Sequence, residues 1–180
     1  VIPTYNRCEK LQKCLEALFN QGLQLNPSDP QFEIVVVDDG SADDTQNVLN
    51  KLRAKSPVPL KFHSQPNRGQ GVARNLGISK AEGDIILMIG DDIVAAPTLL
   101  EEHLKMHDAH PEENSGALGF ITWSPELAVT PLMRFMERGG AIFGRAGGHQ
   151  FALLLRRVEE RLSRENREMG GHAVGPPVGD

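Results

Sequence analysis

One apolar run that ends in two carboxylates constrains this chain more than any other stretch: residues 84–92 read DIILMIGDD. Five consecutive large apolar residues are too few to span a membrane and too continuous for a strand with one face in water. The run therefore predicts a central parallel strand that is buried on both faces. Gly90 frees the backbone there, and Asp91 and Asp92 follow where the strand leaves the sheet.

A second acid pair, upstream in the chain, changes the interpretation of Asp91 and Asp92. In open α/β sheets, ligands bind at the carboxyl ends of the strands, and two adjacent carboxylates repel each other unless a cation or hydrogen-bond donors offset their charge. A single Asp pair also suits a turn or a helix N-cap. However, Asp38 and Asp39 follow another apolar run, residues 32–37. We therefore expect four carboxylates along one edge of the sheet.

Predicted strands alternate with predicted helices over most of the chain. Apolar runs and β-branched residues predict strands at 1–2, 32–37, 60–63, 85–89 and 117–122. Helical spacing predicts helices at 11–22, 43–57, 72–80, 97–110 and 131–137. This alternation predicts an α/β fold with a mostly parallel, helix-covered sheet.

Composition limits the partners of the chain. The 24 acidic and 19 basic residues give a net charge of −5, which provides no electrostatic reason to bind nucleic acid or an anionic membrane surface. No apolar stretch is long enough to predict a membrane span. Cys8 and Cys14 are expected to be reduced thiols. Because Val1 stands within an apolar pattern, we expect the natural N-terminus to lie further upstream.

Four motifs occur in the order that is typical of the family 2 glycosyltransferases. The chain resembles the nucleotide-binding half of their GT-A fold over roughly residues 1–125, and the motifs that carry the resemblance are VIPTYNR at 1–7, VVVDDGS at 35–41, NRG with ARN at 67–75, and GDD at 90–92. The resemblance implies a GT-A (Rossmann-like) α/β domain, here truncated.

The resemblance also implies a set of site residues. Nucleotide-sugar binding falls to Pro3, Tyr5, Asp38, Asp39, Arg68 and Asp91. The ring of Tyr5 offers a flat face to a nucleobase, and Arg68 could neutralise phosphate. Asp91 and Asp92 would hold Mg²⁺ or Mn²⁺, because carboxylate oxygens suit hard cations. The family often has Asp-x-Asp here, but Ile89 stands at the first acid position.

The function implied is a metal-dependent, inverting transfer of a sugar from a nucleoside-diphosphate donor to a hydroxyl of a glycan, lipid or protein acceptor. The resemblance also implies that the protein acts in the synthesis of cell-envelope polysaccharide, in the cytoplasm or at the inner face of the membrane. One alternative is a catalytically incomplete fragment that only binds nucleotide sugar. Another is a phosphoacceptor-type α/β domain, in which an acid pair also binds Mg²⁺.

The last part of the chain departs from the family pattern. We expect a GT-A nucleotide-sugar-binding domain at 1–148 and an atypical tail at 149–180 that is disordered or read in a shifted frame. Residues 151–168 are rich in Arg and Glu and lack the acceptor-side pattern of the family. The family's general base comes from an acidic motif downstream of the metal strand. Glu159 and Glu160 do not match it, so no catalytic base is assigned.

Overall fold

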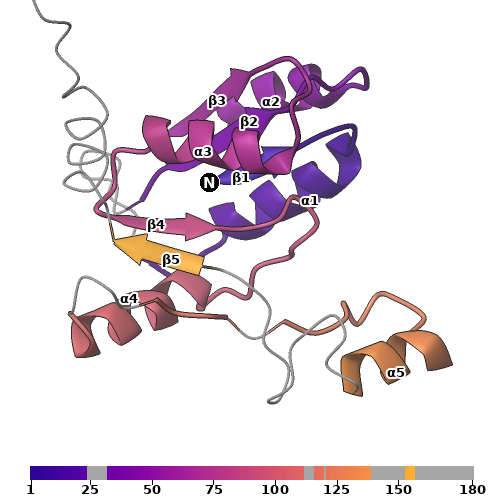
Figure 1. The fold of residues 1–180 in the computed structure, drawn as a ribbon, viewed down its shortest axis with the longest axis vertical. Coiled ribbons are helices and arrows are strands. Elements are labelled where there is room, and N and C mark those ends of the chain that lie inside the picture. Colours follow the sequence, from indigo (N-terminus) through magenta and orange to yellow (C-terminus); the bar gives the residue numbers. More distant parts are fainter. Residues whose placement is uncertain (24–31, 112–115, 120, 139–152, 157–180) are drawn as a thin grey trace, which may run out of the picture.

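The computed structural model describes residues 1–23, 32–111, 116–119, 121–138 and 153–156. Helices and strands alternate through the first 110 residues, as the sequence predicts (Figure 1). The elements are β1 (Ile2–Thr4), α1 (Cys8–Phe19), β2 (Ile34–Asp38), α2 (Thr45–Arg53), β3 (Leu60–Ser64), α3 (Gln70–Lys80), β4 (Ile85–Met88), α4 (Leu99–Ala109), α5 (Pro131–Arg138) and β5 (Leu153–Arg156).

The first three strands form a parallel sheet in the order β1-β2-β3. Ile2 of β1 lies opposite Val36 of β2, and Ile34 of β2 lies opposite Leu60 of β3. Every residue of β2 is buried, which suits a strand that has neighbours on both sides and helices on both faces. The prediction of a mostly parallel, helix-covered sheet is confirmed for this part.

Two hydrogen bonds place β4 beside β1. The amino group of Val1 donates to the carbonyl of Leu87 at 2.7 Å, and the amide of Ile89 donates to the carbonyl of Val1 at 3.1 Å. One residue bonded to positions two apart on its neighbour is the parallel pattern. The strands therefore follow the order β3-β2-β1-β4, and the acid pair after β4 reaches the same edge as the ends of β1 and β2.

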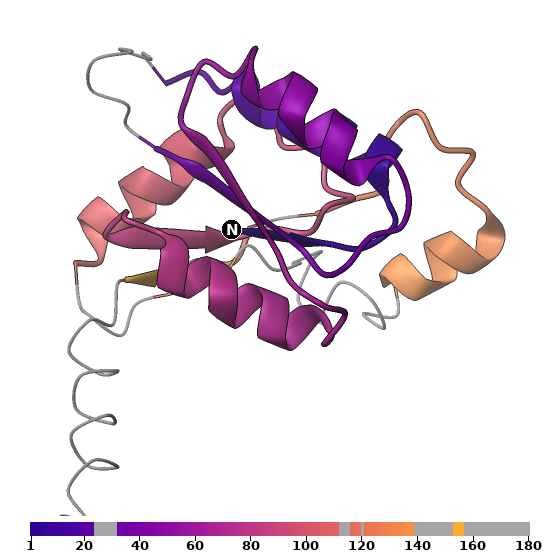
Figure 2. The ribbon, with the colours of Figure 1, turned by 90° about the horizontal axis from the view of Figure 1, so that it is seen from above.

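Helices cover the two faces of this sheet unequally. α1 and α2 lie together on one face and α3 lies on the other (Figure 2). Successive residues of β2 alternate between the two layers: Ile34 and Val36 pack with α1 and α2, whereas Val35 packs with Ala81 at the end of α3. Cys14 is buried in the first layer, and both cysteines are free thiols, as expected.

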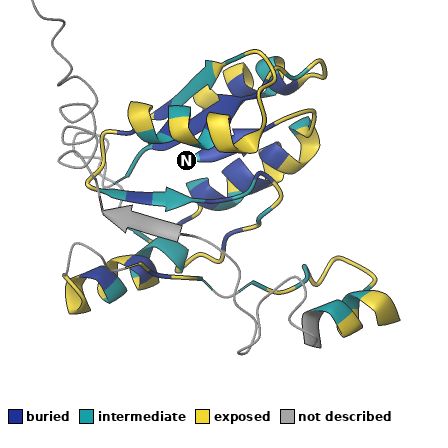
Figure 3. Cartoon of the chain, in the orientation of Figure 1, coloured by how far each residue is buried: buried dark blue, intermediate teal, exposed yellow. Residues whose placement is uncertain are grey.

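The prediction that β4 is buried on both faces is wrong. Only Ile86 of the strand is fully buried, and its neighbours are half-buried (Figure 3). The reason is a cavity of about 300 Å³ lined by Ile85 and Leu87 on one side and by Leu100 and His103 of α4 on the other. α4 therefore leaves space against β4, whereas Ile86 packs against the α3 layer.

The strand predicted at residues 117–122 is not found in the described residues of that range, which have no regular structure. Instead β5 pairs with β4, antiparallel, with Ile86 opposite Leu155. β5 falls within the tail predicted at 149–180 to be disordered or read in a shifted frame, and the other residues of that tail lie outside the described residues. Among the helices that the structure describes, none is both long and apolar enough for a membrane span.

Candidate functional site

A hollow of about 370 Å³ lies at the carboxyl ends of the strands. Its walls come from the segment after β1, the residue after β2, the loop between β3 and α3, and the first acid after β4. The lining residues are Pro3, Thr4, Tyr5, Arg7, Asp39, Asn67, Gly69, Gln70 and Asp91. The structure therefore brings four of the predicted site residues, Pro3, Tyr5, Asp39 and Asp91, into one pocket. Their roles stay predictions.

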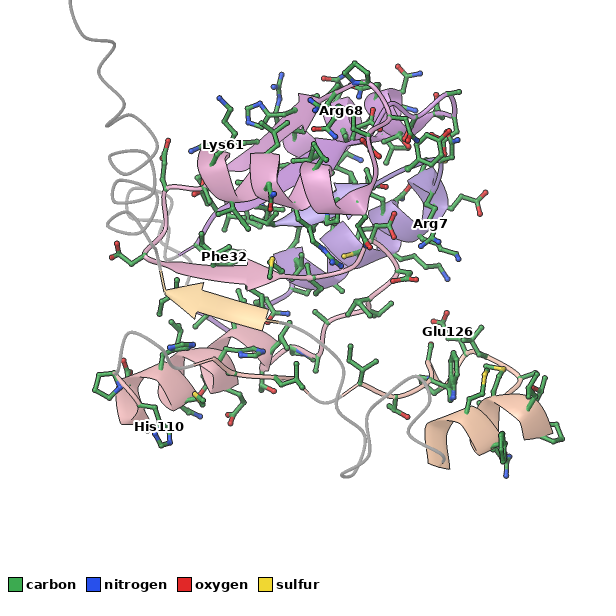
Figure 4. All side chains as sticks on the ribbon, viewed as in Figure 1. Arg7, Phe32, Lys61, Arg68, His110 and Glu126 are labelled. Carbon is green, nitrogen blue, oxygen red and sulfur yellow. The ribbon has the colours of Figure 1, made fainter. Side chains whose placement is uncertain are left out.

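Asp91 and Asp92 differ in environment. The side chain of Asp91 is only 7% exposed, and its Oδ2 accepts a hydrogen bond from the hydroxyl of Thr4 at 2.8 Å. The side chain of Asp92 is 49% exposed. Nη1 of Arg7 lies 3.2 Å from Asp91 Oδ1 and 3.4 Å from Asp92 Oδ2, and Arg7 lies next to the loop after β4 (Figure 4). The guanidinium offsets the repulsion between the two carboxylates.

Gly90 is required by the position of Asp92. A Cβ at residue 90 would lie 2.9 Å from Oδ1 of Asp92, which is closer than Cβ atoms approach other heavy atoms. Glycine therefore lets the Asp92 carboxylate fold back over the turn. The sequence indicated that Gly90 frees the backbone, but Gly90 does not have a positive φ, and the reason for a glycine that the structure gives is this steric one.

Asp39 fastens the loop between β3 and α3 to the end of β2. Its carboxylate accepts hydrogen bonds from the amides of Arg68 at 2.9 Å and Gly69 at 2.8 Å, and from Nε2 of Gln65 at 2.6 Å. Burial alone would raise the pKa of the Asp39 carboxyl, but these hydrogen bonds lower it below its usual range. Asp39 is therefore a buried anion that holds one wall of the pocket in place.

Three predicted site residues do not line the pocket: Asp92, which is the exposed member of the acid pair, Asp38 and Arg68. Asp38 is buried, and its carboxylate accepts from the amide of Ser41 at 2.9 Å and from Gln46 of α2. Adjacent residues of a strand point to opposite sides, so Asp38 turns toward α2 while Asp39 turns toward the loop. The side chain of Arg68 is exposed; its amide donates to Asp39, and its positive charge also helps to lower the pKa of that carboxyl.

The loops that carry Tyr5 and Asp39 are joined to each other. The amide of Asn6 donates to Oγ of Ser41 at 2.9 Å, and its side-chain oxygen accepts from the amide of Ala42 at 2.7 Å. Asn6 has a φ of 52°, a left-handed conformation that Asn tolerates better than most residues. Gly40, at φ 82°, packs so closely on Asn67 that a Cβ would lie 2.9 Å from its amide nitrogen.

Asp91 and Asp92 fit a hard divalent cation whose remaining ligands come from a bound substrate and water. Within the described residues, no group of three or more His, Cys, Asp or Glu side chains could hold a metal ion by itself. Mg²⁺ is commonly held by one or two carboxylates together with substrate phosphates and water. Asp91 and Asp92 would supply the two protein carboxylates of such a site.

Thr4 and Arg7 are site residues to which the sequence analysis assigned no role. Both stand in the first motif: Thr4 lies between Pro3 and Tyr5, and Arg7 lies directly before the start of α1. A basic residue directly after a strand end is a usable signal, because parallel strand ends meet at one edge. The sequence could not indicate that Arg7 contacts the acid pair, since 84 positions separate it from Asp91.

Comparison with known proteins gives a consistent family. The model of glycosyl transferase family 2 matches residues 1–120. The uncharacterised glycosyltransferase YfnE of Bacillus subtilis is 35% identical over 121 residues, which is 67% of this chain and 29% of that protein. The poly(ribitol-phosphate) beta-N-acetylglucosaminyltransferase TarS of Staphylococcus aureus is 29% identical over 62% of this chain and 19% of its own length. The chain thus spans less than a third of each relative.

Solved structures agree on the fold. TarS residues 1–349, in complex with UDP-GlcNAc, gives a TM-score of 0.60 at 24% identity and covers 91% of this chain and 46% of its own. A mannosyltransferase from Pyrobaculum calidifontis, in complex with GDP-Man and Mn²⁺, gives 0.61 at 18% identity and covers 94% and 45%. At these identities the likeness shows the fold alone. The prediction of a GT-A type α/β fold is confirmed.

Proposed function

Because the chain belongs to glycosyl transferase family 2, we propose that it carries the donor-binding part of a metal-dependent, inverting glycosyltransferase. The observation that supports this proposal is the pocket at the strand ends, where the exposed ring of Tyr5 lies on the same hollow as Asp91. We also propose that residues 1–148 form the nucleotide-sugar-binding domain.

Each side of the pocket suits one part of a nucleoside-diphosphate sugar. Tyr5 is 46% exposed, so its ring is free to stack on a nucleobase beside Pro3. Asp39 and Asp91 are carboxylates that can accept hydrogen bonds from a base or a ribose hydroxyl. The TarS complex contains UDP-GlcNAc and the mannosyltransferase complex contains GDP-Man, so a uracil and a guanine base are both candidates for the face of Tyr5.

The reaction we propose is an in-line displacement at the anomeric carbon. A hydroxyl of a glycan, lipid or protein acceptor attacks, the bond to the diphosphate breaks, and the configuration at that carbon inverts. Asp91 and Asp92 would hold Mg²⁺ or Mn²⁺, which offsets the negative charge on the departing nucleoside diphosphate. The chain's own contribution is to fix the donor at Tyr5 and to hold the acid pair at the diphosphate end. We propose that this takes place in the cytoplasm or at the inner face of the membrane, on cell-envelope polysaccharide.

A second candidate is a fragment that binds nucleotide sugar without turnover. The hydrogen bonds that the pocket carboxylates already accept from the protein favour it. Asp39 and Asp91 both accept several hydrogen bonds from neighbouring residues, and Asp92 pairs with Arg7. In the described part of the pocket, both lining carboxylates, Asp39 and Asp91, already accept hydrogen bonds from the protein. We therefore assign no general base.

Thermal shifts with UDP and GDP, each with and without Mn²⁺, test donor binding. Stabilisation that depends on both nucleotide and Mn²⁺ is expected. Stabilisation by Mg²⁺ alone, with no response to nucleotide, would instead favour a phosphoacceptor-type domain. A turnover assay that follows release of nucleoside diphosphate separates a transferase from a fragment that only binds.

A further inference from the structure

Arg7 pairs with both carboxylates of the acid pair after β4. One nitrogen of its guanidinium, Nη1, contacts both Asp91 at 3.2 Å and Asp92 at 3.4 Å. In the part of the chain that the structure describes, it is the one basic side chain that pairs with either carboxylate. Asp91 and Asp92 are also the two side chains that would hold the divalent cation in the proposed function.

The oxygens of Asp91 already accept hydrogen bonds before any ligand arrives. Oδ1 accepts from Arg7, and Oδ2 accepts from the hydroxyl of Thr4. A cation that binds this pair must therefore compete with the Arg7 guanidinium for the same carboxylates.

Arg7 has another partner within reach once a donor is bound. Its side chain is 49% exposed, it stands on the short loop between β1 and α1, and it lines the same pocket as Tyr5 and Asp91. A guanidinium pairs well with phosphate oxygens, often through two parallel hydrogen bonds. A diphosphate in the pocket would therefore compete with Asp91 and Asp92 for Arg7. When Arg7 pairs with the diphosphate, the two carboxylates lose their positive partner, and a divalent cation takes its place.

We propose that Arg7 is an internal counter-ion of the Asp91–Asp92 pair, exchanged for the divalent cation when a diphosphate binds. This inference rests on the proposed function and adds a positioning residue to it. Its consequence is coupling: the diphosphate strengthens binding of the cation, and the cation strengthens binding of the diphosphate by the same factor. Without a diphosphate, Arg7 holds the acid pair and keeps its affinity for free cation low.

The test measures Mn²⁺ affinity of the full chain by calorimetry and by the electron paramagnetic resonance signal of free Mn²⁺, alone and with saturating inorganic pyrophosphate. Pyrophosphate probes the diphosphate end without a choice of base. Arg7→Gln should bind Mn²⁺ alone roughly fivefold more tightly than the wild type, as expected for loss of a partly exposed charge partner. The gain in Mn²⁺ affinity on adding pyrophosphate should shrink in the same variant.

Two further variants control the comparison. Arg7→Lys keeps the charge but loses the planar group that suits paired phosphate contacts, so it should fall between Arg7→Gln and the wild type. Lys10→Gln removes one positive charge from the first turn of α1, three positions after Arg7, where the side chain is exposed, and should change neither value. The complex of Mn²⁺ with pyrophosphate in solution is the same in every sample and cancels between variants.

The outcomes separate this inference from the proposed function. If the wild type binds no Mn²⁺ even with pyrophosphate, both the metal-dependent transfer and the role of Arg7 are overturned. If the wild type binds Mn²⁺ and Arg7→Gln gives the same affinities with and without pyrophosphate, only the role of Arg7 is overturned. Equal changes in Lys10→Gln and Arg7→Gln would also overturn it, because they would reveal a general charge effect. Matching thermal unfolding of all variants checks that each is folded.

Discussion

The hydroxyl of Thr4 donates a hydrogen bond of 2.8 Å to the carboxylate of Asp91, across 87 positions of the sequence. Both side chains are buried, and both also line the pocket at the strand ends. This bond joins the end of β1 to the turn after β4. It fixes the direction of the Asp91 carboxylate and leaves one of its oxygens, Oδ1, facing Arg7.

Thr4→Val should therefore destabilise the protein. Valine has nearly the same shape as threonine but no hydroxyl, so a buried oxygen of Asp91 loses its donor, at a cost of about 1–3 kcal/mol in the free energy of unfolding. Urea unfolding measures the change. Thr4→Ser keeps the hydroxyl and is the matched control. An equal loss of stability in both variants would contradict this role of the hydroxyl, because Thr4→Ser keeps it.

Asp92→Asn should abolish the Mn²⁺-dependent part of nucleoside-diphosphate binding and leave the fold intact. The side chain is 49% exposed and contributes little to the core, but it supplies one of two carboxylates to the proposed cation site. Calorimetry with UDP and GDP, with and without Mn²⁺, measures the effect. Asp108→Asn, on the exposed face of α4, is the control. Unchanged Mn²⁺-dependent affinity in Asp92→Asn would contradict the assignment.

Tyr5→Ala should weaken binding of a nucleoside diphosphate more than binding of pyrophosphate. Loss of a stacking ring is worth about 1–3 kcal/mol per base. Tyr5→Phe keeps the ring and should bind nearly as tightly as the wild type. If Tyr5→Ala lowers both affinities by the same factor, Tyr5 supports the pocket wall and does not stack on the base.

Gly90→Ala should lower the affinity for Mn²⁺ in the presence of a nucleoside diphosphate. The added methyl group would lie 2.9 Å from Oδ1 of Asp92 and would push that carboxylate out of place. Gly71→Ala is the matched control, because a Cβ at residue 71 in α3 meets nothing within 4 Å. There the change should stabilise the helix by about 0.5–1 kcal/mol. Equal Mn²⁺ affinities in the two variants would argue against this role of Gly90.

Asp39 should make part of the stability depend on pH. Because its pKa is lower in the folded protein than in the unfolded chain, its contribution is present above the ordinary pKa of an aspartate and is lost as the pH falls through the folded value. Asp39→Asn cannot accept all three hydrogen bonds and should lose about 1–3 kcal/mol at pH 7. Unfolding free energies measured between pH 7 and acid should fall less steeply in this variant. Parallel curves for variant and wild type would contradict the prediction.

The order of the elements and the acid pairs at the strand ends could be predicted from the sequence. Both are local properties: β-branched runs favour strands, helical spacing favours helices, and an Asp pair after a strand reaches the carboxyl edge. The pocket that unites Tyr5, Asp39 and Asp91 follows from these features once the sheet is parallel.

Contacts between distant segments decided what the sequence left open. Asp38 and Asp39 are adjacent, yet the partners available on each side of β2 make Asp38 a contact of α2 and Asp39 the anchor of the loop before α3. The apolar run at 85–89 predicts a fully buried strand, but the distance of α4 from β4 leaves one face half-covered. Arg7 meets the acid pair because β1 and β4 end side by side. Such pairings depend on which strands become neighbours, and local sequence patterns carry no information about neighbours that are many positions away.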